Sequence, residues 1–213
     1  MALIKEALCG KSYSMLHFEH QVEVEYEYGG LNVDAILDLA ENNTHLRQLE
    51  IHCISIQLSN IERICHVASN HPSLVHLYLC RCCDQPGRGN RMPESLLSSD
   101  TKLQSLGMED NGITNDVIVQ LARFLESNPR LRELDLEDNQ LGGSDCAEML
   151  ANALEKNTTL RHLELKDNDW DSLSTERLRY ALYNTSSLNA MSDSNHYCGL
   201  AELDELSVES ECL

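Results

Sequence analysis

The chain lacks long apolar runs and has few basic residues. No stretch is long enough to form a transmembrane helix, and residues 1–10, which include Lys5 and Glu6, hold no apolar run of the kind found in a secretory signal. The 16 Lys and Arg are outnumbered by 35 Asp and Glu, which gives a formal net charge of −19. Nucleic acids and anionic membranes bind basic surfaces, so this charge argues against both as partners. We expect a cytoplasmic protein.

Sequence motifs of catalytic and metal sites are also missing. No nucleophile elbow, no zinc-protease HExxH and no dinucleotide-binding fingerprint occurs in the chain. Cys80, Cys82 and Cys83, with His76 nearby, lack the second cysteine pair that is typical of a zinc site. We therefore predict no catalytic residues, no cofactor and no metal, and we expect the nine scattered cysteines to be reduced thiols.

The sequence does contain an internal repeat. Three segments, which begin at Leu103, Leu131 and Leu160, share the pattern L-x-x-L-x-L-x-x-N-x-apolar. The same anchor recurs at Leu46 and Leu74, and in weakened form at residues 188–191. Successive anchors are 28, 29, 28, 29 and 28 residues apart. A fixed period of this length, with a strand and a helix in each unit, indicates a solenoid.

Helical stripes lie between the anchors. Ile118, Leu121, Ala122 and Leu125 precede Leu131 by 13, 10, 9 and 6 residues. This spacing places the four side chains on one face of a helix, which can then pack against a sheet. Apolar residues stand at the same four offsets before three other anchors, Leu46, Leu74 and Leu160.

Over roughly residues 20 to 192 the pattern resembles the ribonuclease-inhibitor type of leucine-rich repeat. The resemblance implies an α/β solenoid, a horseshoe with a parallel sheet on its concave face and helices on its convex face. It also implies that the consensus residues Asn111, Asn139 and Asn168 lie inside and bond the backbone where each strand ends. We predict an N-terminal cap or disordered segment at 1–20, a repeat domain of about seven units at 21–195, and an acidic, disordered tail at 196–213.

Three places depart from the repeat. Apolar residues and glutamates alternate over residues 22–28, which predicts the first, edge strand of the sheet, with charges that discourage aggregation. Residues 85–93 are rich in Pro, Gly and Arg, which predicts a loop with at most a short helix. This segment is either a functional irregularity or the least stable part of the repeat array. The last unit is weak, and after Arg179 the chain has no Lys or Arg at all.

The candidate functional surface consists of strand residues that point away from the core. The third, fifth and seventh positions of each repeat face the open side of the sheet, because strand side chains alternate. Carboxylates at these positions would form a negative patch in the later units, either as a solvated acidic face or as a docking surface for a basic protein with Tyr78 as its apolar anchor. The predicted partner-binding residues are His76, Tyr78, Glu109, Glu133, Asp135, Glu137, His162 and Glu164.

These features predict a monomeric, non-enzymatic module that binds a protein partner, with basic proteins fitting best, on its concave face. In the family that the chain resembles, ribonuclease inhibitors capture basic proteins with an acidic solenoid of reduced thiols, although their array is much longer. Two alternatives stay open. One is the repeat region of an innate-immune-type receptor. The other is a GTPase-activating protein of the leucine-rich-repeat type, whose acidic C-terminal tail is similar to residues 202–211.

Overall fold

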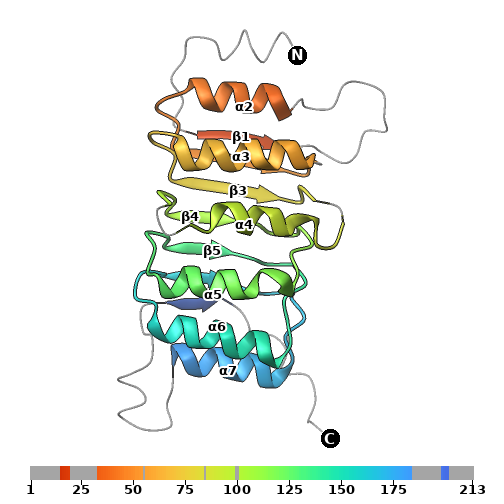
Figure 1. Cartoon of the computed structure of the whole chain (residues 1–213), viewed down its shortest axis with the longest axis vertical. Coiled ribbons are helices and arrows are strands. Elements are labelled where there is room, and N and C mark those ends of the chain that lie inside the picture. The colour runs from red at the N-terminus through yellow and green to blue at the C-terminus, as the bar shows by residue number, and fades with distance from the viewer. Residues whose placement is uncertain are drawn as a thin grey trace, which may run out of the picture.

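The computed structural model describes residues 15–19, 33–54, 56–83, 85–98, 101–183 and 198–201. They form an open α/β solenoid, in which helices cover one face of a single parallel sheet (Figure 1). The fold class predicted from the sequence is confirmed.

The sheet has seven strands in chain order, each parallel to its neighbours. The register places Leu106 beside Leu134 and Leu134 beside Leu163, so equivalent leucines of successive units stack in one row. This stacking is what the 28/29-residue spacing requires. The strands are β1 Met15–Glu19, β2 Gln48–His52, β3 His76–Cys80, β4 Ser105–Gly107, β5 Glu133–Asp135, β6 His162–Glu164 and β7 Gly199–Ala201.

Six α-helices of the described residues stack side by side in chain order on the other layer (Figure 1). Their buried residues are those of the predicted stripes, for example Ile118, Leu121 and Leu125 in α5. No helix in this part of the chain is both long and apolar enough to cross a membrane. The helices are α2 Val33–Asn42, α3 Leu58–Asn70, α4 Arg91–Leu96, α5 Ile118–Glu126, α6 Ser144–Lys156 and α7 Ser172–Leu182, with 3₁₀ turns η1 Arg88–Asn90 and η2 Asn115–Val117.

The consensus asparagines form a ladder of hydrogen bonds where the strands end. Asn139 Oδ1 accepts from the backbone N–H of Asn111 at 3.2 Å and of Ile113 at 2.9 Å. Its Nδ2 donates to the carbonyls of Met108 and Leu136, both at 3.0 Å. An amide both donates and accepts, so one side chain satisfies backbone groups of two successive units. The predicted structural role of these asparagines is confirmed.

The residue before each consensus position has a left-handed backbone. The φ angles of Asp110, Asp138 and Asp167 are 49°, 52° and 53°, and those of Cys53 and Arg81 are 54° and 53°. Each turn is tied to the next unit: the N–H of Asp110, for example, donates to the carbonyl of residue 137 at 3.0 Å. Aspartate tolerates this conformation better than most side chains. The turns therefore place three aspartates in a row at the edge where the strands end.

The first strand lies earlier in the chain than predicted. β1 occupies Met15–Glu19 within the segment assigned to a cap, and its register sets Leu16 beside Leu49 and Phe18 beside Ile51. The strand that pairs with β2 is thus β1, and residues 22–28, where the edge strand was predicted, lie outside the described part of the chain. The apolar residues of β1 form a shorter pattern than the alternation that follows them in the sequence.

The last strand lies later than predicted. β7 pairs with β6 and sets Leu200 beside Leu163, so the anchor at 188–191 is wrong, and those residues lie outside the described ones. Sixteen residues, 183–198, connect α7 to β7, whereas five, 157–161, connect α6 to β6. The longer connection breaks the 28/29 period on which the prediction rested. Part of the expected disordered tail, 199–201, is thus a strand, and the other domain boundaries stay predictions.

The irregular segment between β3 and β4 forms a short helix, as predicted. η1 and the six-residue α4 occupy it, and Met92 and Leu96 are buried. Asn90 is also buried, with its Nδ2 donating to Thr114 Oγ1 at 2.9 Å and its Oδ1 accepting from Thr114 N at 2.9 Å. A Cβ on Gly89 would lie 2.3 Å from the carbonyl oxygen of Asn111. The segment is therefore packed closely against the following unit.

Candidate protein-interaction surface

The structure places six of the predicted partner-binding residues on strands β3, β5 and β6, and the other two, Glu109 and Glu137, shortly after strands β4 and β5. His76 and Tyr78 lie on β3, Glu133 and Asp135 on β5, and residues 162 and 164 on β6. Neighbouring strands are about 4.8 Å apart, so their outward side chains are close neighbours. We call the following five carboxylates the concave patch: Glu109, Glu133, Asp135, Glu137 and Glu164.

A row of hydrogen bonds crosses three strands at the start of this surface. His76 Nδ1 lies 2.9 Å from Ser105 Oγ, and Ser105 Oγ donates to Glu133 Oε2 at 2.7 Å. Because the single hydroxyl proton goes to Glu133, the bond to His76 requires an N–H donor at Nδ1. The row fixes the direction of the Glu133 carboxylate.

This row does not form a hydrolase triad. In such a triad the histidine lies between the serine and the acid and accepts the serine proton. Here Ser105 lies between His76 and Glu133, and it is only 2% exposed. The order of the groups and the burial of the hydroxyl both argue for a positioning role.

Tyr78 lies against a glycine of the neighbouring strand. A Cβ built on Gly107 would lie 2.5 Å from Tyr78 Cδ1, so any larger residue there would displace the ring. The ring is half-buried in this position. In the register Gly107 is paired with Tyr78 on one side and with Asp135 on the other. The glycine thus lets an aromatic surface lie beside the acidic strands.

Burial and mutual repulsion act on the carboxylates of the concave patch. Burial raises the pKa of Asp135, and the charges of Glu109 and Glu164 raise it further, against the hydrogen bond that Asp135 Oδ1 accepts from the Glu137 N–H at 2.9 Å. Burial, followed by Glu164, Glu109 and Asp135, also raises the pKa of Glu137. A positive charge placed over these strands would favour the ionised form of both groups.

The acidic surface continues over the edge where the strands end. Burial, followed by the charges of Asp110 and Asp167, raises the pKa of Asp138. At one end of this row Arg81 Nε donates to Asp110 Oδ2 at 2.7 Å. The three left-handed turns therefore extend the negative field beyond the sheet.

The cysteines next to this surface are not reactive. Cys80 Sγ donates to Glu109 Oε2 at 3.2 Å, and burial, with Glu109, raises the pKa of the Cys80 thiol to about 12. Cys82 points inward and donates to the carbonyl of Ile51 at 3.3 Å. The two thiols diverge, as the alternation of a strand predicts. Within the ranges that the structure describes, no three His, Cys, Asp or Glu side chains are arranged to hold a metal ion.

On the convex face, arginines pair with some of the carboxylates. Arg63 of α3 pairs with Asp38 at 2.7 Å and Glu41 at 2.9 Å, both on α2. Arg177 of α7 pairs in the same way with Glu148 at 2.6 Å and Glu155 at 3.0 Å, both on α6. These pairs tie neighbouring helices together and neutralise part of the negative charge of the convex face.

Sequence reasoning missed two residues that shape this surface. Ser105 and Gly107 were expected to face the open side of the sheet, but nothing in one sequence shows that Ser105 bonds His76 and Glu133 across strands. The glycine at position 107, at the end of β4, was a signal of close approach by another group. The ring of Tyr78 is that group.

Comparisons with known proteins agree with this architecture. The family described as "Leucine Rich repeat" matches residues 127–149 and 156–169. The ribonuclease inhibitor of Mus musculus is 30% identical over 112 residues, which are 53% of this chain and 25% of that protein. The chain thus spans about a quarter of the length of this curated relative.

Two solved structures share the fold at low sequence identity. The tropomodulin C-terminal domain of Caenorhabditis elegans has a TM-score of 0.53 and 16% identity, over 78% of this chain and 94% of that one. The actin-binding site 2 of leiomodin-1 has a TM-score of 0.53 and 19% identity, over 70% of this chain and 89% of that one. Together with the stacked 28/29-residue units, these findings show a leucine-rich-repeat solenoid that is similar to the ribonuclease-inhibitor type.

Proposed function

We propose that the chain is a non-enzymatic interaction module whose concave face binds a basic protein. The observation that carries this proposal is the concave patch itself. Its carboxylates lie on adjacent strands, where burial and repulsion raise the pKa of Asp135 and of Glu137. Like charges on neighbouring strands destabilise a sheet. A basic partner would remove that repulsion, so the patch is better suited to the bound state than to the free one.

The two parts of the surface have different roles in this proposal. The carboxylates attract a basic partner over a distance and accept hydrogen bonds from its arginines, which can be bidentate. The ring of Tyr78, held against Gly107, supplies apolar contact area and a face on which a guanidinium can stack. Arginine-rich segments therefore fit the surface better than lysine-rich ones.

The relatives suggest which proteins to test first. The mouse protein is by name an inhibitor of ribonuclease, and a basic ribonuclease is accordingly the first probe. This chain spans only about a quarter of that inhibitor, so we expect weaker binding over a smaller contact area. The leiomodin-1 structure is, by its name, an actin-binding site. Monomeric actin is therefore the second probe, and it tests a different kind of partner.

The test uses two triple variants that change the net charge by the same amount. E133K/D135K/E137K reverses the concave patch, and E62K/D145K/E176K reverses three exposed helical carboxylates. Calorimetric titration should show that the first variant binds basic ribonuclease at least about tenfold more weakly, and that added salt weakens the wild type in the same direction. The second variant should bind as the wild type does. An equal loss of affinity in both variants would mean that net charge alone determines binding, which would contradict the proposal.

The GTPase-activating alternative finds less support. Proteins of that class would present asparagines and an arginine to the GTPase. The consensus asparagines Asn111 and Asn139 are instead buried and bonded to the backbone. We therefore expect no stimulation of GTP hydrolysis when the chain is added to a small GTPase.

A further inference from the structure

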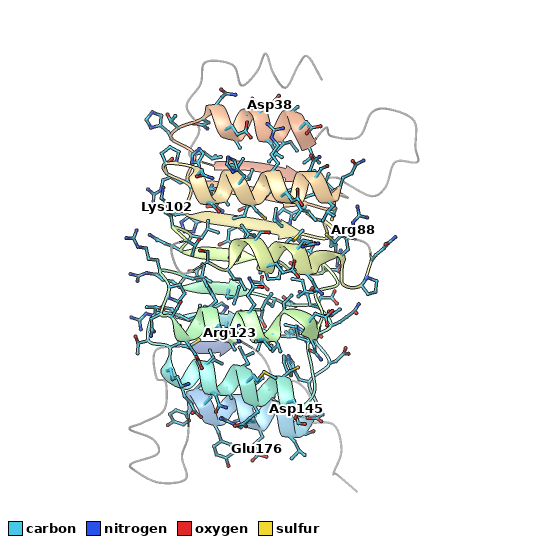
Figure 2. The ribbon with its side chains drawn as sticks, in the orientation of Figure 1. Asp38, Arg88, Lys102, Arg123, Asp145 and Glu176 are labelled. Carbon is cyan, nitrogen blue, oxygen red and sulfur yellow. The ribbon has the colours of Figure 1, made fainter. Side chains whose placement is uncertain are left out.

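The edge of the solenoid where helices end and strands begin is basic, although the whole chain is strongly acidic. Lys102, Arg130, Arg132 and Arg161 are exposed there, in the turns that lead into β4, β5 and β6. We call these four residues the basic edge. Figure 2 shows Lys102 on one side of the molecule, with Arg88 and Asp145 on the opposite side.

Backbone hydrogen bonds fix the spacing of these cations. The N–H of Arg132 donates to the carbonyl of Gln104 at 2.7 Å, and the N–H of Arg161 donates to the carbonyl of Arg132 at 2.7 Å. Arg132 and Arg161 therefore stand at equivalent positions of adjacent strands, about 4.8 Å apart at the backbone. Lys102 lies two residues before Gln104, the equivalent position of the preceding unit, and Arg130 lies two residues before Arg132. Four positive charges are thus held within three neighbouring units.

Three carboxylates of the same units have partners other than Lys102, Arg130 and Arg132. Glu126 pairs with Lys156 at 2.9 Å, Glu155 pairs with Arg177 at 3.0 Å, and Glu133 accepts from a serine on the concave face. Among the described residues no ion pair joins Lys102, Arg130 or Arg132 to a carboxylate. The dipole of a preceding helix favours a cation only within its last turn, and these residues follow the helices at a greater distance.

We propose that the basic edge binds the chain's own acidic C-terminal segment, residues 202–213. That segment contains Glu202, Asp204, Glu205, Glu209 and Glu211 and has no Lys or Arg. Charge complementarity between this segment and the four exposed cations of the basic edge is therefore strong.

The segment begins where β7 ends, within reach of the basic edge. The strand before it, β7, pairs with β6, and the N–H of Gly199 donates to the carbonyl of Arg161 at 2.8 Å. Ala201 pairs with Glu164, three residues along the strand and about 10 Å from Arg161. Twelve residues span up to about 40 Å when extended. The segment is long enough to return to Arg161 and to cross the next two units.

The test is a zero-length cross-linking experiment on the full chain. Carbodiimide joins an amine to a carboxylate only when the two are in contact, and the R132K variant supplies an amine in the middle of the basic edge without changing its charge. Mass spectrometry should find cross-links from position 102 or 132 to residues 202–213. The ion pair between Lys156 and Glu126, at 2.9 Å, is the internal positive control.

Charge-reversal variants of R132K provide the comparison. Adding R130E/R161E should lower the yield of tail cross-links by about fivefold or more, and high salt should act in the same direction. Adding R88E/R91E, which changes the net charge equally on the far side, should leave the yield unchanged. Mixing ¹⁵N-labelled with unlabelled chains separates a link within one chain from a link between two.

Three results would overturn the proposal. One is the absence of tail cross-links while the Lys156–Glu126 link forms. Another is a yield that does not change when the basic edge is reversed. The third is that the links join two different chains, which would make the edge a contact between copies.

Discussion

Asn139 contributes to the fold at the scale of a single residue. Its amide bonds backbone groups of its own unit and of the unit before it. Asn139→Leu keeps the volume but leaves buried N–H and C=O groups without partners, each of which costs about 1–3 kcal/mol. We expect urea denaturation to show a loss of at least about 3 kcal/mol in the free energy of unfolding. Gln140→Ala, at the exposed neighbouring position, should change it by less than about 0.5 kcal/mol.

His71 has a counterpart later in the chain. It lies three residues before Leu74, with Nε2 3.0 Å from the carbonyl of Asn43 and Nδ1 accepting the N–H of Leu74 at 3.0 Å. Asn157, three residues before its own anchor, makes the matching bonds with its amide. His71→Asn should therefore unfold within about 1 kcal/mol of the wild type, and His71→Ala should lose about 2 kcal/mol. Similar losses for both variants in chemical denaturation would contradict this equivalence.

A substitution of Asp135 should change stability and partner binding in opposite directions. Its folded-state pKa lies above the ordinary value of 3.8, so the folded state holds more protons than the unfolded state in the window between the two. Stability then falls as the pH rises through that window. Asp135→Asn keeps the acceptor for the Glu137 N–H and removes the charge. At pH 7 the variant should be more stable than the wild type by a few tenths to about 1 kcal/mol.

Thermal unfolding from pH 3 to 7 checks the Asp135→Asn prediction. The gain should vanish below the ordinary aspartate pKa, where the wild-type carboxyl is protonated as well. The same variant should bind a basic protein more weakly at pH 7, because one of the five attracting charges is gone. A variant that is less stable and binds as well as the wild type would show that Asp135 is a structural residue.

At the scale of elements, the turns after the strands contain residues that differ in how easily they adopt a positive φ. Cys53 has a φ of 54°, where later units have aspartate. A side chain without a compensating local hydrogen bond costs about 1–2 kcal/mol in this conformation. Cys53→Asn should therefore raise the free energy of unfolding by a few tenths to about 1 kcal/mol in thermal denaturation. Cys53→Ala, which keeps the steric cost, should give no such gain.

The elements also show how far the sequence predicted the fold. Helices α3, α5 and α6 and strands β2 to β6 follow from burial, because the apolar side chains that must leave water recur at fixed spacing. β1 and β7 were not predicted, because strands of five and three residues carry little local signal. Their place is fixed by pairing with β2 and β6, which is a contact between distant residues.

The candidate site was predicted in the same way. The alternation of strand side chains was enough to place Tyr78, Asp135 and Glu164 on one face. The bond from Ser105 to Glu133 and the contact of Tyr78 with Gly107 depend on which strands are neighbours, and the basic edge depends on charges from three units. Such features follow from stacking and are visible only once the register is known.

At the scale of the whole molecule, stacking separates structural from functional residues. The leucines and the asparagines are buried between units, and the alternate strand side chains face the open side of the sheet. Charge follows the same repeat: the helices carry ion pairs, carboxylates lie over the concave strands, and exposed cations lie where the strands begin. The basic partner that we propose would therefore be attracted to the concave side.

The most direct test of this account is a map of amide chemical shifts during titration with a basic ribonuclease. We predict that the perturbed amides belong to β4, β5 and β6 and to the turns that follow them, with Asp135 and Glu164 among the most affected. The amides of α5, α6 and α7 on the opposite layer should stay unchanged. Perturbations confined to those helices, or no perturbation with any basic protein at low salt, would contradict the proposed concave binding surface.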